Sequence, residues 1–217
     1  DTRGIPDRSA ARVIPQRQRA GKDFVKAPHP GPLGSLLDGF SIEDEPAPYA
    51  GGIGNDGADA LKKFVSDGGT LVALNRAADA IIDLFDLPVT NVIKDAKSDR
   101  FFCSGALLQI HLNEGGAATL GMPSDPIVMF ERGPAFAPKD NFKGEVIARY
   151  APGINPLRSG VLMHPEAIMG KAAALRVDYG KGHIYLYGFQ PQWRAQSHGS
   201  YKFLFNALYT SPDNGAH

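Results

Sequence analysis

Apolar residues follow regular helical or strand spacing only from about residue 55 onward. There the spacing i, i+3, i+4, i+7 predicts an amphipathic helix that Asn55 caps at its start. Gly68-Gly69 predicts its end, because glycine accepts the left-handed backbone that closes many helices. The apolar face of this helix consists of Ala58, Leu61, Phe64 and Val65.

A short apolar run, Thr70–Leu74, follows this helix at once and predicts a buried strand. Asn75-Arg76 ends the strand before a second predicted helix. The order helix, strand, helix is typical of an α/β layered sheet. The apolar face of the second helix consists of Ala78, Ile81, Ile82 and Phe85.

The rest of the chain is predicted to be rich in strands and to end in a helix. A hairpin is expected where residues 172–178 and 183–189 flank Tyr179-Gly180-Lys181-Gly182. The last helix follows a cap at Ser197 or Ser200, and its predicted apolar face is Tyr201, Leu204, Phe205 and Leu208. The other expected strands are Phe101-Phe102, Leu107–Leu112, Ile127–Phe130 and Glu145–Tyr150.

The first 50 residues differ from the remainder in composition. They hold seven prolines and no sustained periodicity, which predicts an irregular arm. Residues 1–26 carry seven Lys and Arg against three acids, whereas residues 27–59 carry six acids and no Lys or Arg. We therefore divide the chain into an arm (1–50), an α/β domain (51–211) and a tail (212–217). Because no core strand is predicted before the first helix, we also expect a sheet that lacks an opening strand. Such a sheet has an exposed edge, which favours self-association.

Composition narrows the classes of function. The 217 residues contain 23 Lys and Arg against 23 Asp and Glu, so no long-range field favours nucleic acid or an anionic membrane. No apolar run approaches the roughly 20 residues of a membrane span. The single cysteine, Cys103, excludes an internal disulfide. The chain begins at Asp1 without Met, which suggests a fragment or a processed product of unknown localisation.

Two loops that lead from strands into helices are the places where α/β sheets collect ligands. They are Asn75-Arg76 and Gln190–Ser200, and the second contains the only tryptophan, Trp193. Its polar groups suit a carboxylate or a phosphate. The alternative is structural: Trp193 and Gln196 seal the final helix, and Arg194 forms an internal ion pair.

The sequence gives less support to a metal site or a reactive thiol than to a ligand site in these two loops. The histidines (His29, His111, His164, His183, His198 and His217) are scattered without ligand spacing, so we expect no metal site and no cofactor in this chain. Cys103 follows two phenylalanines in a predicted strand, which favours a buried, inert thiol. No Walker, dinucleotide or G-x-S-x-G motif occurs.

The segments LKKFVSDGGTLVAL (residues 61–74) and GKGHIYLYGFQPQWRAQSHGSYKFLFNALY (residues 180–209) resemble the C-terminal domain of bacterial zinc carboxypeptidase-like proteins of the carboxypeptidase A type. That domain is similar to class I glutamine amidotransferases. The resemblance spans about residues 45 to 210 and implies a flavodoxin-like, amidotransferase-like sheet with helices on both faces and extra β-strands. It also implies a periplasmic or secreted parent protein, with zinc only in an upstream peptidase domain.

The amidotransferase comparison can be made at each catalytic position. The family has a Cys at the elbow after a core strand, where this chain has Asn75-Arg76. The family's late His-Pro-Glu corresponds to Gln190-Pro191-Gln192. A glutamine accepts no proton near neutral pH and an asparagine amide is a poor nucleophile, so the resemblance implies a domain that has lost this chemistry.

Three hypotheses for function follow. The first is a non-catalytic accessory domain whose partner is the upstream peptidase domain or a carboxylate-bearing ligand. The second is a thiol hydrolase or amidotransferase that uses Cys103 with His183 or His198, so whether the chain is an enzyme stays open. The third is a peptide- or carbohydrate-binding module that uses Trp193, Tyr201 and Arg194. In the first case we expect one cleft formed by Asn75, Arg76, Gln190, Gln192, Arg194 and His198.

Overall fold

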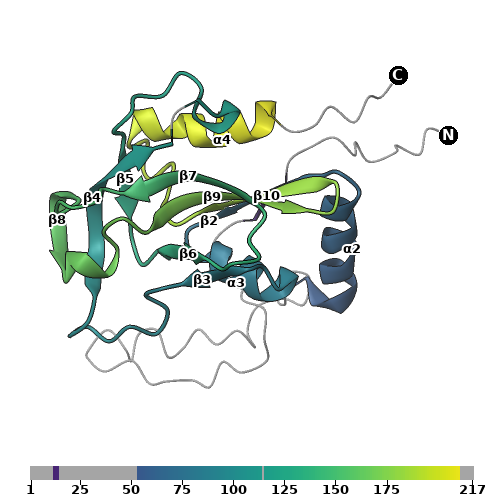
Figure 1. Ribbon diagram of the computed structural model, residues 1–217, viewed down its shortest axis with the longest axis horizontal. Helices are drawn as coiled ribbons and strands as arrows, with labels where there is room; N and C mark the ends of the chain where they lie inside the picture. The colour runs from purple at the N-terminus through teal and green to yellow at the C-terminus, as the bar shows by residue number, and fades with distance from the viewer. Residues whose placement is uncertain (1–11, 15–52, 114, 211–217) are drawn as a thin grey trace, which may run out of the picture.

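The protein is an α/β structure built on one curled, mixed sheet (Figure 1). The computed structural model describes residues 12–14, 53–113 and 115–210. Every helix in these ranges is too short or too polar to cross a membrane. The helices are α2 (Gly54–Ser66), α3 (Ala77–Phe85) and α4 (Tyr201–Tyr209), with short 3-10 turns η2 (Ala117–Thr119), η3 (Pro165–Ala167) and η4 (His198–Ser200).

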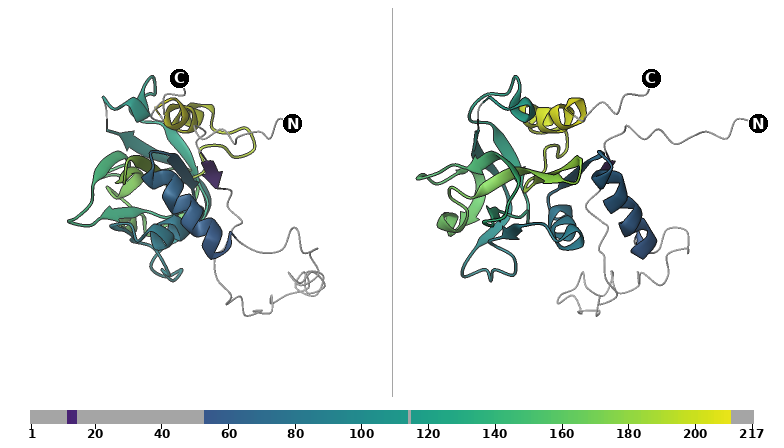
Figure 2. Two further views of the ribbon diagram at one scale, coloured as in Figure 1. Left: turned by 90° about the vertical axis from the view of Figure 1, so that its right-hand side faces the viewer. Right: turned by 45° about the vertical axis from the view of Figure 1, so that its right-hand side comes forward.

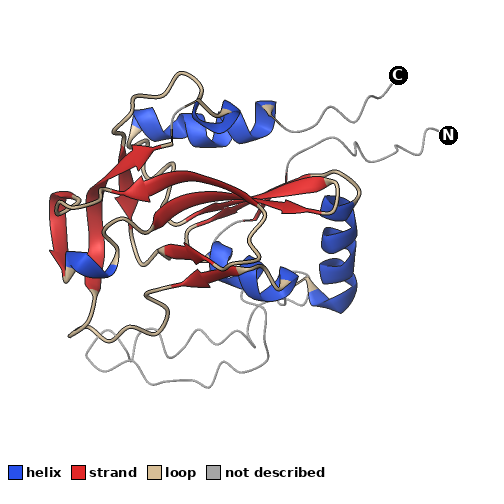
Figure 3. Cartoon of the chain, viewed as in Figure 1, coloured by secondary structure: helices blue, strands red, loops and turns tan. Residues whose placement is uncertain are grey.

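The strands form a sheet in the order β1-β2-β10-β9-β7-β4-β5. Only the pairs β1–β2 and β2–β10 are parallel, while the remaining pairs are antiparallel. In Figure 3, β4, β5 and β8 turn across the direction of the other strands, so the sheet curls at that end. The strands are β1 (Arg12–Ile14), β2 (Thr70–Leu74), β3 (Val89–Asn91), β4 (Phe102–Leu112), β5 (Ile127–Phe130), β6 (Phe136–Pro138), β7 (Gly144–Tyr150), β8 (Leu157–Met163), β9 (Ala172–Tyr179) and β10 (Gly182–Tyr187).

Side chains that alternate along β2 and β10 divide the core into two clusters. Leu71 and Ile184 belong to a cluster that includes the buried faces of α2 and α3. Val72 and Tyr185 belong to the other cluster, which includes buried residues of α4. Because successive residues of a strand point to opposite faces, each of these two strands is buried on both sides. Figure 1 shows α4 on one side of the sheet and α2 and α3 on the other.

Three aromatic rings hold α4 against the sheet. Phe203 lies with its ring centroid 5.4 Å from that of Tyr187 and 5.0 Å from that of Phe189. The Tyr187 hydroxyl donates a 2.8 Å hydrogen bond to the carbonyl oxygen of Phe203. Burial raises the pKa of Tyr187 well above its ordinary value, so this hydroxyl keeps its proton.

Several elements agree with the sequence predictions. The strand Thr70–Leu74 has the predicted bounds, and the apolar face of α3 is buried as expected. The α2 helix ends at Ser66, and Gly68 has a φ of 120°. The predicted hairpin is the antiparallel pair β9–β10. The predicted α/β class is thus confirmed.

Other predictions need correction. Asn55 does not cap α2, because the helix begins at Gly54 and its N-cap is Ile53. Phe101-Phe102 and Leu107–Leu112 are not separate strands, since β4 runs through Phe102–Leu112 without interruption. The strands β3, β6 and β8 were not predicted, because two have only three residues and β8 is mostly exposed and lacks an apolar pattern.

The arm contributes one strand to the sheet. Arg12–Ile14 pairs in parallel with Leu71–Ala73, so the expectation of a sheet that lacks an opening strand is wrong. In the order of the described strands β1 stands at one end, beside β2. The remainder of the arm and the tail lie outside the described residues.

The predicted apolar face of α4 is correct only in part. Phe203 and Ala207 are buried, whereas Phe205 is 52% exposed and Leu208 is 42% exposed. Ser200 is the N-cap, as one of the two predicted candidates, although its side chain makes no capping hydrogen bond. The helix is therefore rotated so that Phe203 and Ala207 face the sheet and Phe205 and Leu208 point to solvent, while Leu204 still packs partly against the core.

This rotation predicts the effect of two substitutions in the same helix. Phe203→Ala should lower the free energy of unfolding by about 3–5 kcal/mol, because it empties a fully buried site. Phe205→Ala is the matched control and should lower it by only about 1 kcal/mol, because about half of this residue is in solvent. Urea unfolding followed by circular dichroism measures both values, and equal losses would contradict the observed rotation of α4.

Candidate functional site

The turn between β2 and α3 is a sharp, left-handed elbow. Asn75 has a φ of 51° and is 1% exposed to solvent. Its backbone N–H donates to Tyr187 O at 2.7 Å, and its carbonyl oxygen accepts from Ala78 N at 3.0 Å. These bonds join the elbow to the end of β10 on one side and to the first turn of α3 on the other.

Asn75 and Gln190 meet through a third residue, Glu131. The Asn75 side-chain Nδ2 donates to Glu131 O at 2.9 Å. The Gln190 Nε2 lies 3.3 Å from Glu131 Oε2 and donates to it. Gln190 is 6% exposed, and its backbone N–H donates to Met129 O at 2.9 Å. The elbow and the loop after β10 thus converge, as predicted, and a residue at the end of β5 joins them.

Backbone atoms fill the space beside the Asn75 side chain. A methyl group in place of the Gly133 hydrogen would overlap both Gly188 O and Asn75 Oδ1, so only glycine allows this approach. The Tyr150 hydroxyl lies 3.2 Å from the carbonyl oxygens of both Pro134 and Gly188 and donates to them. Asn75 Oδ1 is buried and accepts no hydrogen bond from any described group. The elbow therefore has no open space beside its side chain for a substrate.

The other four predicted site residues lie on the surface. Arg76, Gln192, Arg194 and His198 are all exposed to solvent at least in part. Arg76 is the N-cap of α3. Burial raises the pKa of the nearby Asp79, and the charge of Arg76 has only a small opposite effect. The structure thus joins two of the six residues through Glu131 and places four at the surface.

Gln192, Arg194 and His198 belong to a projecting turn and the short helix after it. Trp193 and Gln196 exchange two backbone hydrogen bonds, of 2.7 and 2.8 Å. Between them Arg194 and Ala195 have φ values of 48° and 60°. The Arg194 guanidinium lies 5.6 Å from the centre of the Trp193 ring, and the His198 ring packs edge-on against Tyr201. The described contacts of Arg194 include no ion pair, contrary to the structural alternative weighed for this residue.

Cys103 lies in β4 and faces the core, as predicted. Burial raises the pKa of its thiol, which disfavours the reactive thiolate. His183 is on β10, separated from β4 by β9 and β7, so about 14 Å of sheet lies between the two residues.

His198 is also remote from Cys103. The neighbouring Ser197 donates a 2.6 Å hydrogen bond to Ile127 O, and Ile127 pairs with Gln109. Gln109 is six residues from Cys103 along β4, which corresponds to roughly 15–20 Å. Activation of a thiol by an imidazole requires about 3 Å, so neither histidine meets this requirement.

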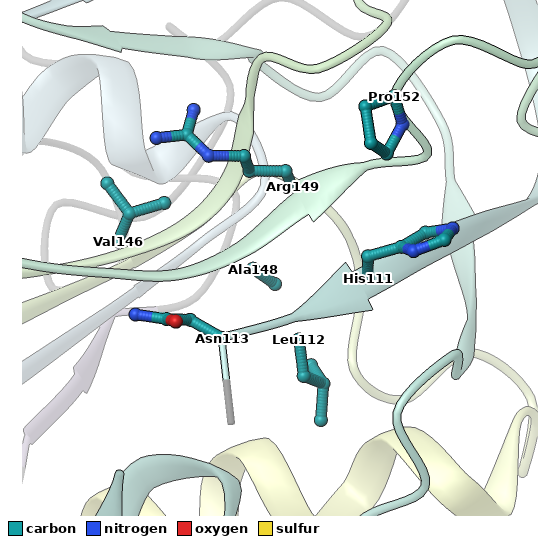
Figure 4. A pocket seen from close by; sticks show the side chains of 7 residues that line it. All are labelled: His111, Leu112, Asn113, Val146, Ala148, Arg149 and Pro152. Carbon is teal, nitrogen blue, oxygen red and sulfur yellow. The ribbon is translucent and has the colours of Figure 1, made fainter. Parts of the chain in front are cut away.

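Two open hollows lie away from the elbow. One, of about 260 Å³, is lined by His111, Leu112, Asn113, Val146, Ala148, Arg149 and Pro152 (Figure 4). His111 and Arg149 face it from paired positions of β4 and β7. His111 Nδ1 lies 3.3 Å from Asp125 Oδ1, and Arg149 donates to Gly170 O at 3.1 Å. The second, of about 380 Å³, lies between the end of β4 and the η2 loop.

Neither hollow is lined by any of the six predicted residues. Across residues 53–113 and 115–210, no three His, Cys, Asp or Glu side chains gather in a way that could hold a metal ion. His29 and His217 lie outside these ranges.

Glu131 was not among the predicted site residues, although it joins the elbow to Gln190. The predicted residues lie in loops that lead from strands into helices, whereas Glu131 follows β5, an antiparallel strand at the curled end of the sheet. The run Glu131-Arg132-Gly133-Pro134 directly after an apolar strand is a turn signal that could have drawn attention to it.

Comparisons with known proteins give matches to solved structures only. No family model and no curated protein matches the chain. A GMP synthase-like protein from Thermoplasma acidophilum is 15% identical with a TM-score of 0.44, over 71% of this chain and 63% of its own. A ThuA-like protein from Bacteroides uniformis is 16% identical with a TM-score of 0.45, over 71% and 62%.

A β-galactosidase from Bacillus circulans is 12% identical with a TM-score of 0.44, over 71% of this chain and 20% of its own. The chain thus spans about three fifths of the first two proteins and a fifth of the third. At these identities and scores the likeness carries no argument about this chain. The expected association with a zinc carboxypeptidase has no support in these comparisons.

The geometry of the elbow predicts how Asn75 variants behave. Asn75→Ala should lower the free energy of unfolding by about 2–4 kcal/mol, because it removes the bond to Glu131 O and forces alanine into a left-handed conformation. Asn75→Gly loses the same bond but accepts this backbone, so it should be about 1 kcal/mol more stable than the alanine variant. Urea denaturation of both variants measures the difference, and equal stability of the two would contradict a strained elbow.

Proposed function

We propose that this chain is a non-catalytic domain with a binding or structural role, in which the catalytic positions of an amidotransferase-like scaffold have become part of the core. The observation that carries the proposal is the buried contact of Asn75 and Gln190 with Glu131. An active site needs its nucleophile and base open to a substrate. Here both positions hold amides that are nearly inaccessible to solvent.

The chemistry of these side chains supports the same proposal. The Asn75 Nδ2 is committed as a donor to a backbone carbonyl, and a neutral amide supplies no nucleophilic lone pair comparable to a thiolate. Gln190 stands where the resemblance implies a general base, yet an amide does not take up a proton near neutral pH. The one carboxylate in contact with these groups, Glu131, accepts a hydrogen bond from Gln190.

The position of Cys103 argues against the rival hypothesis of a thiol hydrolase. Its thiol is buried in the β4 strand, and burial raises its pKa. Both histidines considered as partners are separated from it by several times the distance of a hydrogen bond, as estimated from the strand order and register.

The proposal also concerns the longer protein to which this domain would belong. The segments 61–74 and 180–209 resemble a domain that accompanies a zinc carboxypeptidase, so we propose that this domain assists such an enzyme and that zinc is bound elsewhere in it. The sequence encoded upstream tests this directly. An H-x-x-E motif followed by a later histidine would support it, and an unrelated upstream region would contradict it.

The proposal predicts no hydrolysis of glutamine. Ammonia release from glutamine, measured with a coupled glutamate dehydrogenase assay, should equal the background without protein, because no nucleophile is open to solvent at the elbow. The Cys103→Ser variant should give the same background. Turnover by the wild-type chain that disappears in Cys103→Ser would favour the thiol hydrolase instead.

Burial of Cys103 predicts a slow reaction with a thiol reagent. In the folded chain, reaction with dithionitrobenzoate should be at least about a hundredfold slower than in urea, because the thiolate is disfavoured and the sulfur is covered. Absorbance at the wavelength of the released thiolate follows the reaction. An equal rate in the folded and the unfolded chain would contradict the buried position of the sulfur.

A further inference from the structure

The outward face of α4 carries large apolar side chains in solvent. Tyr201, Phe205, Leu208 and Tyr209 follow helical spacing along one side, opposite the buried Phe203. Phe205 is 52% exposed and Tyr209 is 85% exposed. Figure 2 shows α4 on the outside of the molecule, with its outward side free of the other described elements. Contiguous apolar surface of this kind is typical of a site for a partner.

The η2 loop extends this surface along one flank of the helix. Asn206 Nδ2 donates to Ala118 O and Leu120 O at 3.0 and 3.2 Å, and the Lys202 ammonium donates to Gly121 O. These bonds hold the loop beside α4, where the side chain of Leu120 is left 74% exposed. The loop thus adds an apolar side chain next to a lysine.

The turn that carries Trp193 and Arg194 lies beside the N-terminal end of α4. The Ser200 hydroxyl donates to Pro191 O at 2.6 Å, which fixes the start of the turn against the start of α4. The ring of His198 packs on Tyr201, the first residue of α4. We call the surface made by Leu120, Trp193, Arg194, Tyr201, Phe205 and Tyr209 the α4 face.

The segment that forms the turn and α4 contains basic residues and no acidic ones. Between Asp178 and Asp213 the sequence contains no Asp or Glu, although the whole chain has equal numbers of acids and bases. Arg194 stands at the tip of the turn and Lys202 on the flank of α4. Aromatic side chains bordered by cations are complementary to a ligand that combines apolar groups with carboxylates.

We propose that the α4 face binds an acidic segment of another polypeptide that also carries aromatic or aliphatic side chains. The apolar side chains of the segment pack on Tyr201, Phe205 and Tyr209, and its carboxylates pair with Arg194 and Lys202. This inference rests on the proposed function, since it gives the non-catalytic domain its partner and moves binding from the closed elbow to the surface.

Other occupants fit the face less well. A second copy placed face to face would offer Arg194 and Lys202 no acidic partner from its own turn or α4, because residues 179–212 contain no Asp or Glu. Nucleic acid needs several phosphate contacts for useful affinity, whereas the described cations here are Arg194 on the face and Lys202 on its flank. A membrane surface is favoured by a basic stripe along an amphipathic helix, whereas α4 has nine residues and a single lysine.

The test is a selection of random dodecapeptides displayed on phage against the 217-residue chain, followed by titration of the selected peptides by fluorescence anisotropy. We expect enrichment of peptides that combine Asp or Glu with Phe, Trp, Leu or Ile. Phe205→Ser should weaken their binding at least about tenfold. The matched control is Val161→Ser on β8, a residue that is also 52% exposed but lies in a different element, and it should leave the affinity unchanged.

Charge variants test the second part of the proposal. Arg194→Gln and Lys202→Gln should each weaken binding and reduce its dependence on salt, because each removes one ionic contact. The inference would be overturned if no peptides were enriched, or if the enriched peptides lacked acidic residues. It would also be overturned if Phe205→Ser left the affinity for the peptides unchanged. It would also be overturned by Phe205-dependent dimerisation, or by Phe205-dependent binding to phosphatidylserine vesicles or single-stranded DNA in place of the peptides.

These outcomes are separable from those of the proposed function. Peptide binding that fails while glutamine hydrolysis stays at background overturns the inference alone. Glutamine hydrolysis that depends on Cys103 overturns the proposed function, whatever the peptides do.

Discussion

The parallel pairing of β2 with β10 decides where the candidate residues of this protein lie. His183–Tyr187 runs beside Thr70–Leu74 in register, so both strands end at the same level. The hydrogen bond from Asn75 N to Tyr187 O then continues the ladder by one residue before the chain turns into α3. Because this bond fixes the elbow against the end of β10, the loop that follows β10 has to leave the sheet beside Asn75. The contact between Asn75, Glu131 and Gln190 depends on this geometry.

The antiparallel part of the sheet determines what the elbow can do. Its curl brings the end of β5 to the end of the parallel strands, where Glu131 accepts hydrogen bonds from both amides. The side-chain N–H groups of Asn75 and Gln190 that make these bonds are paired internally and so are not available to a ligand, while Asn75 Oδ1 is buried without a described partner. Gly133 and Gly188 complete the closure by close backbone contact. The same strands that stabilise the elbow thus close it, which is why a surface outside the sheet is the better place for binding.

The rotation of α4 shows how tertiary packing selects among apolar residues. Seven of its nine residues are apolar or aromatic, so more than one face of the helix could be buried. The rings of Tyr187 and Phe189 on the sheet accept Phe203, and the Tyr187 hydroxyl bonds to the backbone of the same residue. A fully buried aromatic side chain contributes more to stability than a half-exposed one, so this contact sets the rotation of the helix. Phe205 and Tyr209 are exposed as a result.

The sequence by itself determined the elements whose signal is local: the strand Thr70–Leu74, the buried face of α3, the hairpin β9–β10 and the buried character of Cys103. It also placed Asn75 and Gln190 at the same end of the sheet, because parallel strands end on one edge. Only the tertiary structure decided the pairing of Arg12–Ile14, the course of β8, the role of Glu131 and the exposed face of α4. Each of these depends on contacts between residues far apart in the chain, and no local spacing of apolar and polar residues encodes them.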